Sequence, residues 1–135
     1  MNNDLQNIFA SAHLRLTQPR IEIFNMLAGT NSPMTIVDVI NACSSVDKVS
    51  VYRTIKLFSE LNIITTITHG WKQSYELNSP FIPHHHHMVC TDCGSLTEIH
   101  SDRVEKLINE ISEEYQFTPS SHHFEVSGVC AKCKK

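Results

Sequence analysis

Residues 48–77 read KVSVYRTIKLFSELNIITTITHGWKQSYEL, and the spacing of their apolar side chains changes at Asn62. Before Asn62 apolar residues recur every three or four positions, which predicts an amphipathic helix with one buried stripe. This stripe consists of Val51, Ile55, Phe58 and Leu61. After Asn62 β-branched residues alternate with polar ones, which predicts strands at 63–68 and 73–77 joined through His69-Gly70-Trp71-Lys72. We therefore expect a helix followed directly by a β-hairpin.

Two further helices are expected before this segment. Thr17-Gln18-Pro19-Arg20 is typical of a helix start, with Thr as the N-cap and Pro in the first turn, and Gly29 marks the end of that helix. A second start lies at Thr35, and the third helix begins between Ser45 and Lys48. Three helices and a hairpin indicate a winged helix-turn-helix, whose third helix enters the DNA major groove. A small helical domain that binds no DNA fits the same pattern.

The sequence predicts an α+β protein with two domains. The segment Asn78 to Pro83 contains two prolines and is the best linker candidate. We expect a winged-helix DNA-binding domain over 1–79, a hinge over 80–83 and a small α/β dimerisation domain over 84–135. The elements expected in the second domain are strands at 85–90 and 95–99, a helix at 102–115 and a strand at 123–129. So few elements cannot bury all their own faces, which favours dimerisation through the sheet or the helix.

The net charge of −3 does not exclude nucleic acid. Residues 1–79 carry six Lys/Arg against six Asp/Glu, whereas residues 80–135 carry five against eight and hold seven of the nine histidines. The acidity therefore belongs to the second half. A neutral first half can bind DNA where a few basic groups gather on one face, in a salt-sensitive way.

The sequence predicts a cytoplasmic protein with no membrane association. No apolar run approaches the roughly 18 residues of a membrane span, and Met1 to Ala12 lacks the pattern of a signal peptide. In a reducing compartment, closely paired cysteines are more often metal ligands than disulfides. Cys43 stands alone and is expected to be a small buried apolar side chain.

The four remaining cysteines form two Cys-x-x-Cys pairs, Cys90 with Cys93 and Cys130 with Cys133. Four thiolates close a tetrahedral zinc shell with no open position, which predicts a structural zinc that ties the last strand to the first. Gly94 and Gly128 flank the pairs and permit tight turns. Redox-active thiols or a disulfide are the competing interpretations, but the thioredoxin-like strand and helix pattern is missing from the sequence around the pairs.

Four consecutive histidines, His84 to His87, lead into the first cysteine pair. Side chains alternate on a strand, so His85 and His87 face one way while His84 and His86 face the other, giving two half-sites for metal. Imidazole suits zinc, iron, nickel and copper alike. A solvated polar linker is the alternative. The residues that can complete the two sites are Glu76, Glu98, Glu105, His122 and His123.

The order of these motifs resembles the ferric uptake regulator family over nearly the whole chain. The motifs are Leu16-Thr17-Gln18-Pro19-Arg20, Val51-Tyr52-Arg53-Thr54-Ile55, Tyr75-Glu76-Leu77, the histidine run, Cys90-x-x-Cys93-Gly94 and Gly128-Val129-Cys130-x-x-Cys133. The resemblance implies a homodimer that binds AT-rich palindromic operators on double-stranded DNA when loaded with a divalent metal. Such a repressor controls metal homeostasis genes and releases the operators when the metal is scarce.

The resemblance also implies DNA-contacting residues. Tyr52 and Arg53 would contact DNA from the third helix, Arg15 would enter the minor groove and Arg20 would contact phosphate. These roles make physical sense, because a tyrosine ring packs on thymine methyls and arginine favours narrow AT-rich minor grooves. The alternative is that Tyr52 belongs to the core and Arg53 is a surface charge.

Two histidine-containing metal sites follow from the same resemblance. A regulatory site would consist of Glu76, His85, His87 and Glu98, and a second site of His84, His86, Glu105 and His122. Pro33 stands where the iron-type site usually has a histidine, so we expect His69 or water to complete the regulatory shell.

The sensed metal stays open between Fe²⁺, Zn²⁺ and Mn²⁺. Asn78 stands where zinc-sensing members carry a cysteine, whereas His86 replaces an aspartate of many iron regulators. Glu76 and Glu98 replace the aspartates of the peroxide-sensing branch. A zinc-sensing regulator is therefore the alternative to an iron-sensing one. A zinc-dependent hydrolase is disfavoured, because no nucleophile motif or phosphate loop follows Cys93, and we expect no enzymatic activity.

Overall fold

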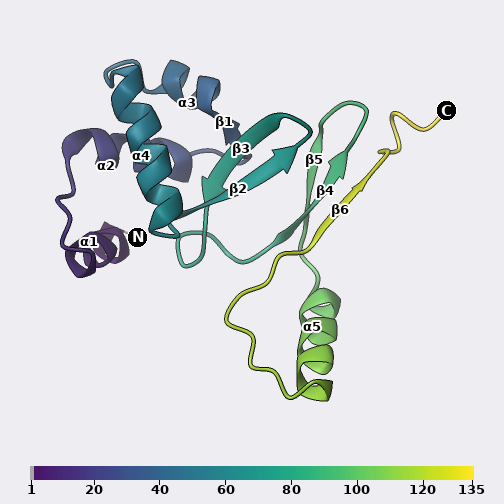
Figure 1. Cartoon of the computed structure of the whole chain (residues 1–135). Helices are drawn as coiled ribbons and strands as arrows, with labels where there is room; N and C mark the ends of the chain where they lie inside the picture. Colours follow the sequence, from purple (N-terminus) through teal and green to yellow (C-terminus); the bar gives the residue numbers. More distant parts are fainter. Residues whose placement is uncertain (1) are drawn as a thin grey trace. The chain divides into compact units, whose positions relative to one another are not determined.

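The structure is a computed structural model that describes residues 2–135, with side chains from residue 3 onward. The chain divides into two compact units, Met1–Pro83 and His84–Lys135 (Figure 1). The first unit contains α1 (Asn2–Ser11), α2 (Gln18–Ala28), β1 (Met34–Thr35), α3 (Ile36–Ala42), α4 (Lys48–Glu60), β2 (Ile64–His69) and β3 (Lys72–Leu77). The second contains β4 (His86–Cys90), β5 (Leu96–Ile99), α5 (Asp102–Glu114) and β6 (Glu125–Gly128). The expected α+β class is confirmed.

Helix α4 and the β2–β3 hairpin form as their sequence predicts. Asp47 caps α4 by accepting a hydrogen bond from the backbone N–H of Ser50 (2.9 Å), and Val51, Ile55 and Phe58 are buried along one face. Gly70 has a φ of 58° at the hairpin turn, a left-handed conformation that glycine adopts without strain. The strand β1 was not expected, because two residues carry no periodic signal. It pairs with β3 to give the sheet order β1-β3-β2.

Helix α1 is a second unexpected element. Its Leu5 and Phe9 are almost fully buried in the core of the first unit, and the ring of Phe9 meets that of Phe58 edge-on at 6.3 Å. Cys43 belongs to the same core, as predicted, and burial raises the pKa of its thiol. The first unit therefore has one contiguous core that α1, α2, α3, α4 and the hairpin share.

The predicted linker is in large part anchored to the first unit. The buried ring of Phe81 packs edge-on against Phe24 at 4.9 Å, and the Asn78 side-chain amide donates to Asn62 (2.9 Å). These contacts explain why the boundary between the units falls after Pro83.

The second unit is a small sheet of order β5-β4-β6 with one helix. Strand β4 pairs antiparallel with β5 and parallel with β6. Every residue of α5 and β6 is at least partly exposed. Large hydrophobic side chains exposed in this unit are Met88, Leu107, Ile111, Tyr115, Phe117, Phe124, Val126 and Val129. Within the described residues, no helix has the length and hydrophobicity needed to cross a membrane.

Candidate metal centres and nucleic-acid interface

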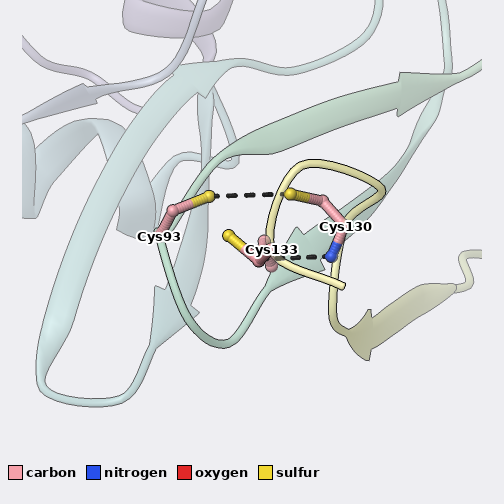
Figure 2. Close-up of side chains that lie close together, drawn as sticks. Cys93, Cys130 and Cys133 are labelled. Atoms are coloured by element: carbon pink, nitrogen blue, oxygen red, sulfur yellow. Dashed lines mark hydrogen bonds between the residues drawn. The ribbon is translucent and has the colours of Figure 1, made fainter. Parts of the chain in front are cut away.

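The four paired cysteines come together at the end of the β4–β6 ladder. Their sulfur atoms all lie within 4.8 Å of one another, and Sγ of Cys93 lies 3.8 Å from Sγ of Cys130, which it faces in Figure 2. Gly94 (φ 71°) provides the tight turn after the first pair, as expected. Gly128 differs from the expectation of a second glycine turn, because it ends β6 and pairs with Cys90 in the parallel ladder.

Hydrogen bonds shift the pKa values of the clustered thiols in different directions. The backbone N–H of Cys130 donates to Cys90 (3.3 Å) and is the largest cause of a pKa lowered to about 6. A hydrogen bond with the Ser95 hydroxyl lowers the pKa of Cys93. The thiol of Cys133 shares hydrogen bonds with Cys130 and Cys93, which raise its pKa to about 12. Crowded thiolates repel one another, so a divalent cation with tetrahedral preference, such as Zn²⁺, fits this donor set.

A second cluster consists of His84, His86, Glu105 and His122, whose ligand atoms also lie within 4.8 Å of one another. The carboxylate of Glu105, in the first turn of α5, is central: its Oε1 lies 2.8 Å from Nε2 of His86 and 3.3 Å from Nε2 of His122. Nε2 of His84 lies 2.9 Å from Nε2 of His122. Three imidazoles and one carboxylate at this spacing can hold a divalent transition metal.

The electrostatics of this cluster centre on Glu105. Burial alone would raise the pKa of Glu105, but the hydrogen bond from His86 and the charges of the three histidines together lower it. Burial lowers the pKa of His84, although the charge of Glu105 opposes that shift. The cluster therefore favours an ionised carboxylate beside a neutral His84, which are the protonation states that bind metal.

The other two histidines of the run lie together, as strand alternation requires. The ring centroids of His85 and His87 are 4.7 Å apart, and His87 pairs with Glu98 across the β4–β5 ladder. Glu76 belongs to β3 of the first unit, opposite Thr65.

The expectation that His69 or water completes the regulatory shell stays a prediction. His69 pairs with Lys72 at the tip of the hairpin, four residues along β3 from Glu76. That separation is about 13 Å along a strand, so both side chains would have to extend toward each other to reach one ion. His123, another candidate from the sequence, is exposed and precedes β6, whereas His122 joins the second cluster. His100 had no assigned role, yet its ring lies 5.7 Å from that of His85.

The expected DNA-contacting residues all belong to the first unit. Tyr52 (56% exposed) and Arg53 project from α4, so Tyr52 is not a core residue. A surface hollow runs from α4 to the hairpin and is lined by Thr35, Ile36, Val37, Asp38, Tyr52, Trp71, Lys72, Gln73 and Tyr75. Trp71, at the hairpin tip, is 91% exposed and had no role assigned from the sequence.

The two arginines near α2 have different surroundings. Arg15 is exposed, whereas Arg20 is half-buried. The guanidinium of Arg20 donates to the carbonyl oxygen of Arg15 and lies 5.4 Å from the ring centre of Phe9. Arg20 therefore fixes the backbone that carries Arg15, in addition to any contact it makes with phosphate.

Residues 11–127 match the family model described as the Ferric uptake regulator family. The chain belongs to this family. A ferric uptake regulation protein of Bacillus subtilis is 35% identical over 86 residues, which are 62% of this chain and 58% of that protein. That of Synechococcus elongatus is 28% identical over 131 residues, 96% of this chain and 78% of the relative. The matched segment thus spans little more than half of the Bacillus protein.

Solved structures of the ferric uptake regulator family share the fold. The Helicobacter pylori ferric uptake regulator, described with three functional metal binding sites, superposes with a TM-score of 0.81 at 22% identity, covering 98% of this chain and 91% of that one. The Pseudomonas aeruginosa regulator, solved with manganese, gives 0.81 at 26% identity and covers 93% and 97%. This likeness confirms the winged-helix unit followed by a small α/β unit.

Proposed function

We propose that this member of the ferric uptake regulator family is a DNA-binding repressor gated by a divalent metal. The observation that carries the proposal is the sorting of one histidine run into two groups, His84 with His86 and His85 with His87, on a chain whose first unit is a winged helix. Metal loading in the second unit would control operator binding by the first. The site of action would be the cytoplasm, where the operators are.

DNA recognition is assigned to the exposed face of α4. Tyr52 and Arg53 would enter the major groove of an AT-rich palindrome, with Arg15 in the minor groove and Arg20 at the phosphates. A zinc uptake regulator of this fold, with a TM-score of 0.58 and 22% identity, was solved with zinc and DNA. That structure supports double-stranded DNA as the partner.

The second unit is proposed to be the dimerisation unit. Its sheet and helix expose large apolar side chains, such as Met88, Leu107 and Val126, that a second copy would cover. Two copies related by a two-fold axis present two α4 helices to a palindrome. Zinc at the four cysteines would hold β4 to β6 and so shape this surface.

The regulatory ion is assigned to Glu76, His85, His87 and Glu98. Glu76 belongs to the first unit and the other three ligands to the second, so one ion bound by all four would favour a single arrangement of the two units. If DNA binds that arrangement best, metal and DNA must strengthen each other's binding by the same factor. The cluster around Glu105 is the second divalent site.

The test is operator binding by fluorescence anisotropy on a short AT-rich palindrome, with and without each of Fe²⁺, Zn²⁺ and Mn²⁺ under anaerobic conditions. We expect metal-dependent binding that a scrambled duplex does not reproduce. Metal analysis of protein isolated anaerobically identifies the resident ion. Equal affinity for the palindrome in the metal-loaded and chelator-treated protein, with zinc retained in both, would refute the gating.

A further inference from the structure

His87 of β4 and His85, which immediately precedes β4, face residues of β5 and of the segment that follows it. His86 pairs with Ile99 and His87 with Glu98, so extending this antiparallel register by one residue places His85 opposite His100. The ring centroids of His85 and His100 are 5.7 Å apart, with 35° between the ring planes. Nε2 of His100 lies 3.2 Å from Oε2 of Glu98. The cross-strand pair His87–Glu98 and the ring pair His85–His100, just beyond the ends of the two strands, therefore stand side by side.

These pairs bring together three imidazoles and one carboxylate, the same donor types as the cluster around Glu105. The side chain of His100 is 63% exposed, so its ring can rotate toward an ion without displacing packed neighbours. His100 also borders the hollow beside His84 and Glu105, but its ring contacts are with His85 and Glu98. His69, by contrast, belongs to the β2–β3 hairpin of the first unit, where it pairs with Lys72.

We propose that His100 is a ligand of the regulatory ion, together with His85, His87 and Glu98. This inference rests on the proposed regulatory site and adds a fourth ligand from the second unit. The second unit would then capture the ion with its own residues, and Glu76 of the first unit would join afterwards. Most of the metal-binding free energy would then come from the second unit alone and would not depend on how the two units are arranged.

Cobalt binding to a chain whose other histidine cluster is disabled tests the assignment. In a His84→Ala/His122→Ala background with zinc at the cysteines, we would add one equivalent of Co²⁺ to four proteins: the background itself, His100→Ala, His69→Ala and His87→Ala. Affinity would be measured by competition with a chelator. Paramagnetic proton NMR would count the shifted imidazole N–H signals, one for each bound histidine.

We expect His100→Ala to weaken Co²⁺ binding at least about tenfold, as even residues that only orient a ligand do, and to lose one imidazole signal. His69→Ala should change neither reading. A His100→Gln variant keeps a polar contact with Glu98 without an imidazole, and we expect it to behave like His100→Ala.

The alternatives give different results. Full affinity in His100→Gln would mean that His100 positions Glu98 and is not a ligand, which overturns the inference. An unchanged His100→Ala beside a defective His87→Ala would overturn the inference and leave the proposed regulatory site intact. Unchanged binding in both variants would remove the proposed site as well. Loss of an imidazole signal in His69→Ala would mean that His69 of the β2–β3 hairpin is the additional ligand of the regulatory ion, in place of His100.

Discussion

The backbone N–H of Cys130 donates a 3.3 Å hydrogen bond to the sulfur of Cys90, at the point where β6 ends beside β4. Strand β6 is exposed along its whole length, so few buried apolar contacts hold it to the sheet. The cysteine cluster therefore has to hold the C-terminal segment in place.

Replacing Cys93 with serine should release zinc and loosen the second unit. The variant removes one of four thiolates, and a structural zinc site with three thiolates loses much of its folding free energy. Zinc content by mass spectrometry and backbone amide NMR of residues 84–135 measure the two effects. Cys43→Ser, which alters a thiol of the other unit, is the control for loss of a cysteine as such. A zinc-free Cys93→Ser protein with an unchanged second-unit spectrum would contradict the structural role.

Arg53→Ala should weaken specific DNA binding and leave metal content unchanged. A lost major-groove contact costs on the order of 1–3 kcal/mol, and the loss should be larger on the palindrome than on random duplex. Lys106→Ala removes one exposed positive charge from the second unit and serves as the matched control. Equal losses in both variants would mean that Arg53 contributes only general electrostatic attraction.

His87→Ala should abolish the metal response while leaving a folded protein with its cysteine-bound zinc. Cys130→Ser, by contrast, should lose zinc and second-unit order. The two variants are compared by metal-dependent anisotropy on the palindrome and by circular dichroism. A metal response that survives in His87→Ala would refute the assignment of the regulatory ion to the site that contains His85 and His87.

The capping box of α3 predicts a pH-dependent contribution to stability. The Asp38 carboxylate accepts hydrogen bonds from the hydroxyl (2.6 Å) and the backbone N–H (2.9 Å) of Thr35, and these bonds lower its pKa. Because the folded pKa is depressed, the stabilisation is fully present above the unfolded value of about 3.9 and is lost as pH falls through the folded pKa.

Asp38→Ala should therefore reduce the free energy of unfolding by about 1 kcal/mol at neutral pH, and by progressively less below about pH 4. Urea titrations of the chelator-treated protein across this range measure the difference. Glu60→Gln, which alters an exposed carboxylate paired with Lys56, is the control. If the loss of unfolding free energy in Asp38→Ala instead grew toward acid pH, the Asp38 carboxylate would not be stabilising in its ionised form.

Phe81→Ala should destabilise the first unit, although the residue lies in the segment predicted to be a hinge. Truncating a buried phenylalanine costs about 3 kcal/mol or more, and here the lost partner is Phe24. Urea unfolding followed by amide NMR of residues 3–78 reports on this unit directly. Ile82→Ala, at a half-buried position next to it, should cost less. An unchanged free energy of unfolding in Phe81→Ala would show that residues 80–83 are not anchored to the first unit in solution.

The elements that could be predicted from sequence are those whose periodicity extends over many residues. Helix α4 and the hairpin are of this kind, because their burial pattern repeats over more than two turns or several strand residues. Strand β1 consists of two residues, too few for any period. Helix α1 does carry a signal, since Leu5, Ile8 and Phe9 have helical spacing, but the segment is short and has few other apolar residues.

The candidate sites follow the same division between local and non-local information. The cysteine pairs and the two faces of the histidine run are local patterns. The meeting of Glu105 with three histidines depends on how α5 and the segment after it return to β4, which spacing cannot give. The contact of His100 with His85 also follows from local information, because the Cys90–Cys93 turn sets the β4–β5 register that brings the two residues together.

Strand β4 and the residues just before it carry both histidine groups, and this has a consequence for how the protein can change over generations. The register of β4 is fixed at one end by Cys90, so a single-residue insertion between His87 and Cys90 would turn every histidine to the opposite face. His84 and His86 would then face Glu98, and His85 and His87 would face Glu105. A change in the length of this strand would thus alter both histidine groups at once. Neither group can therefore change its facing residues by such a mutation without the other.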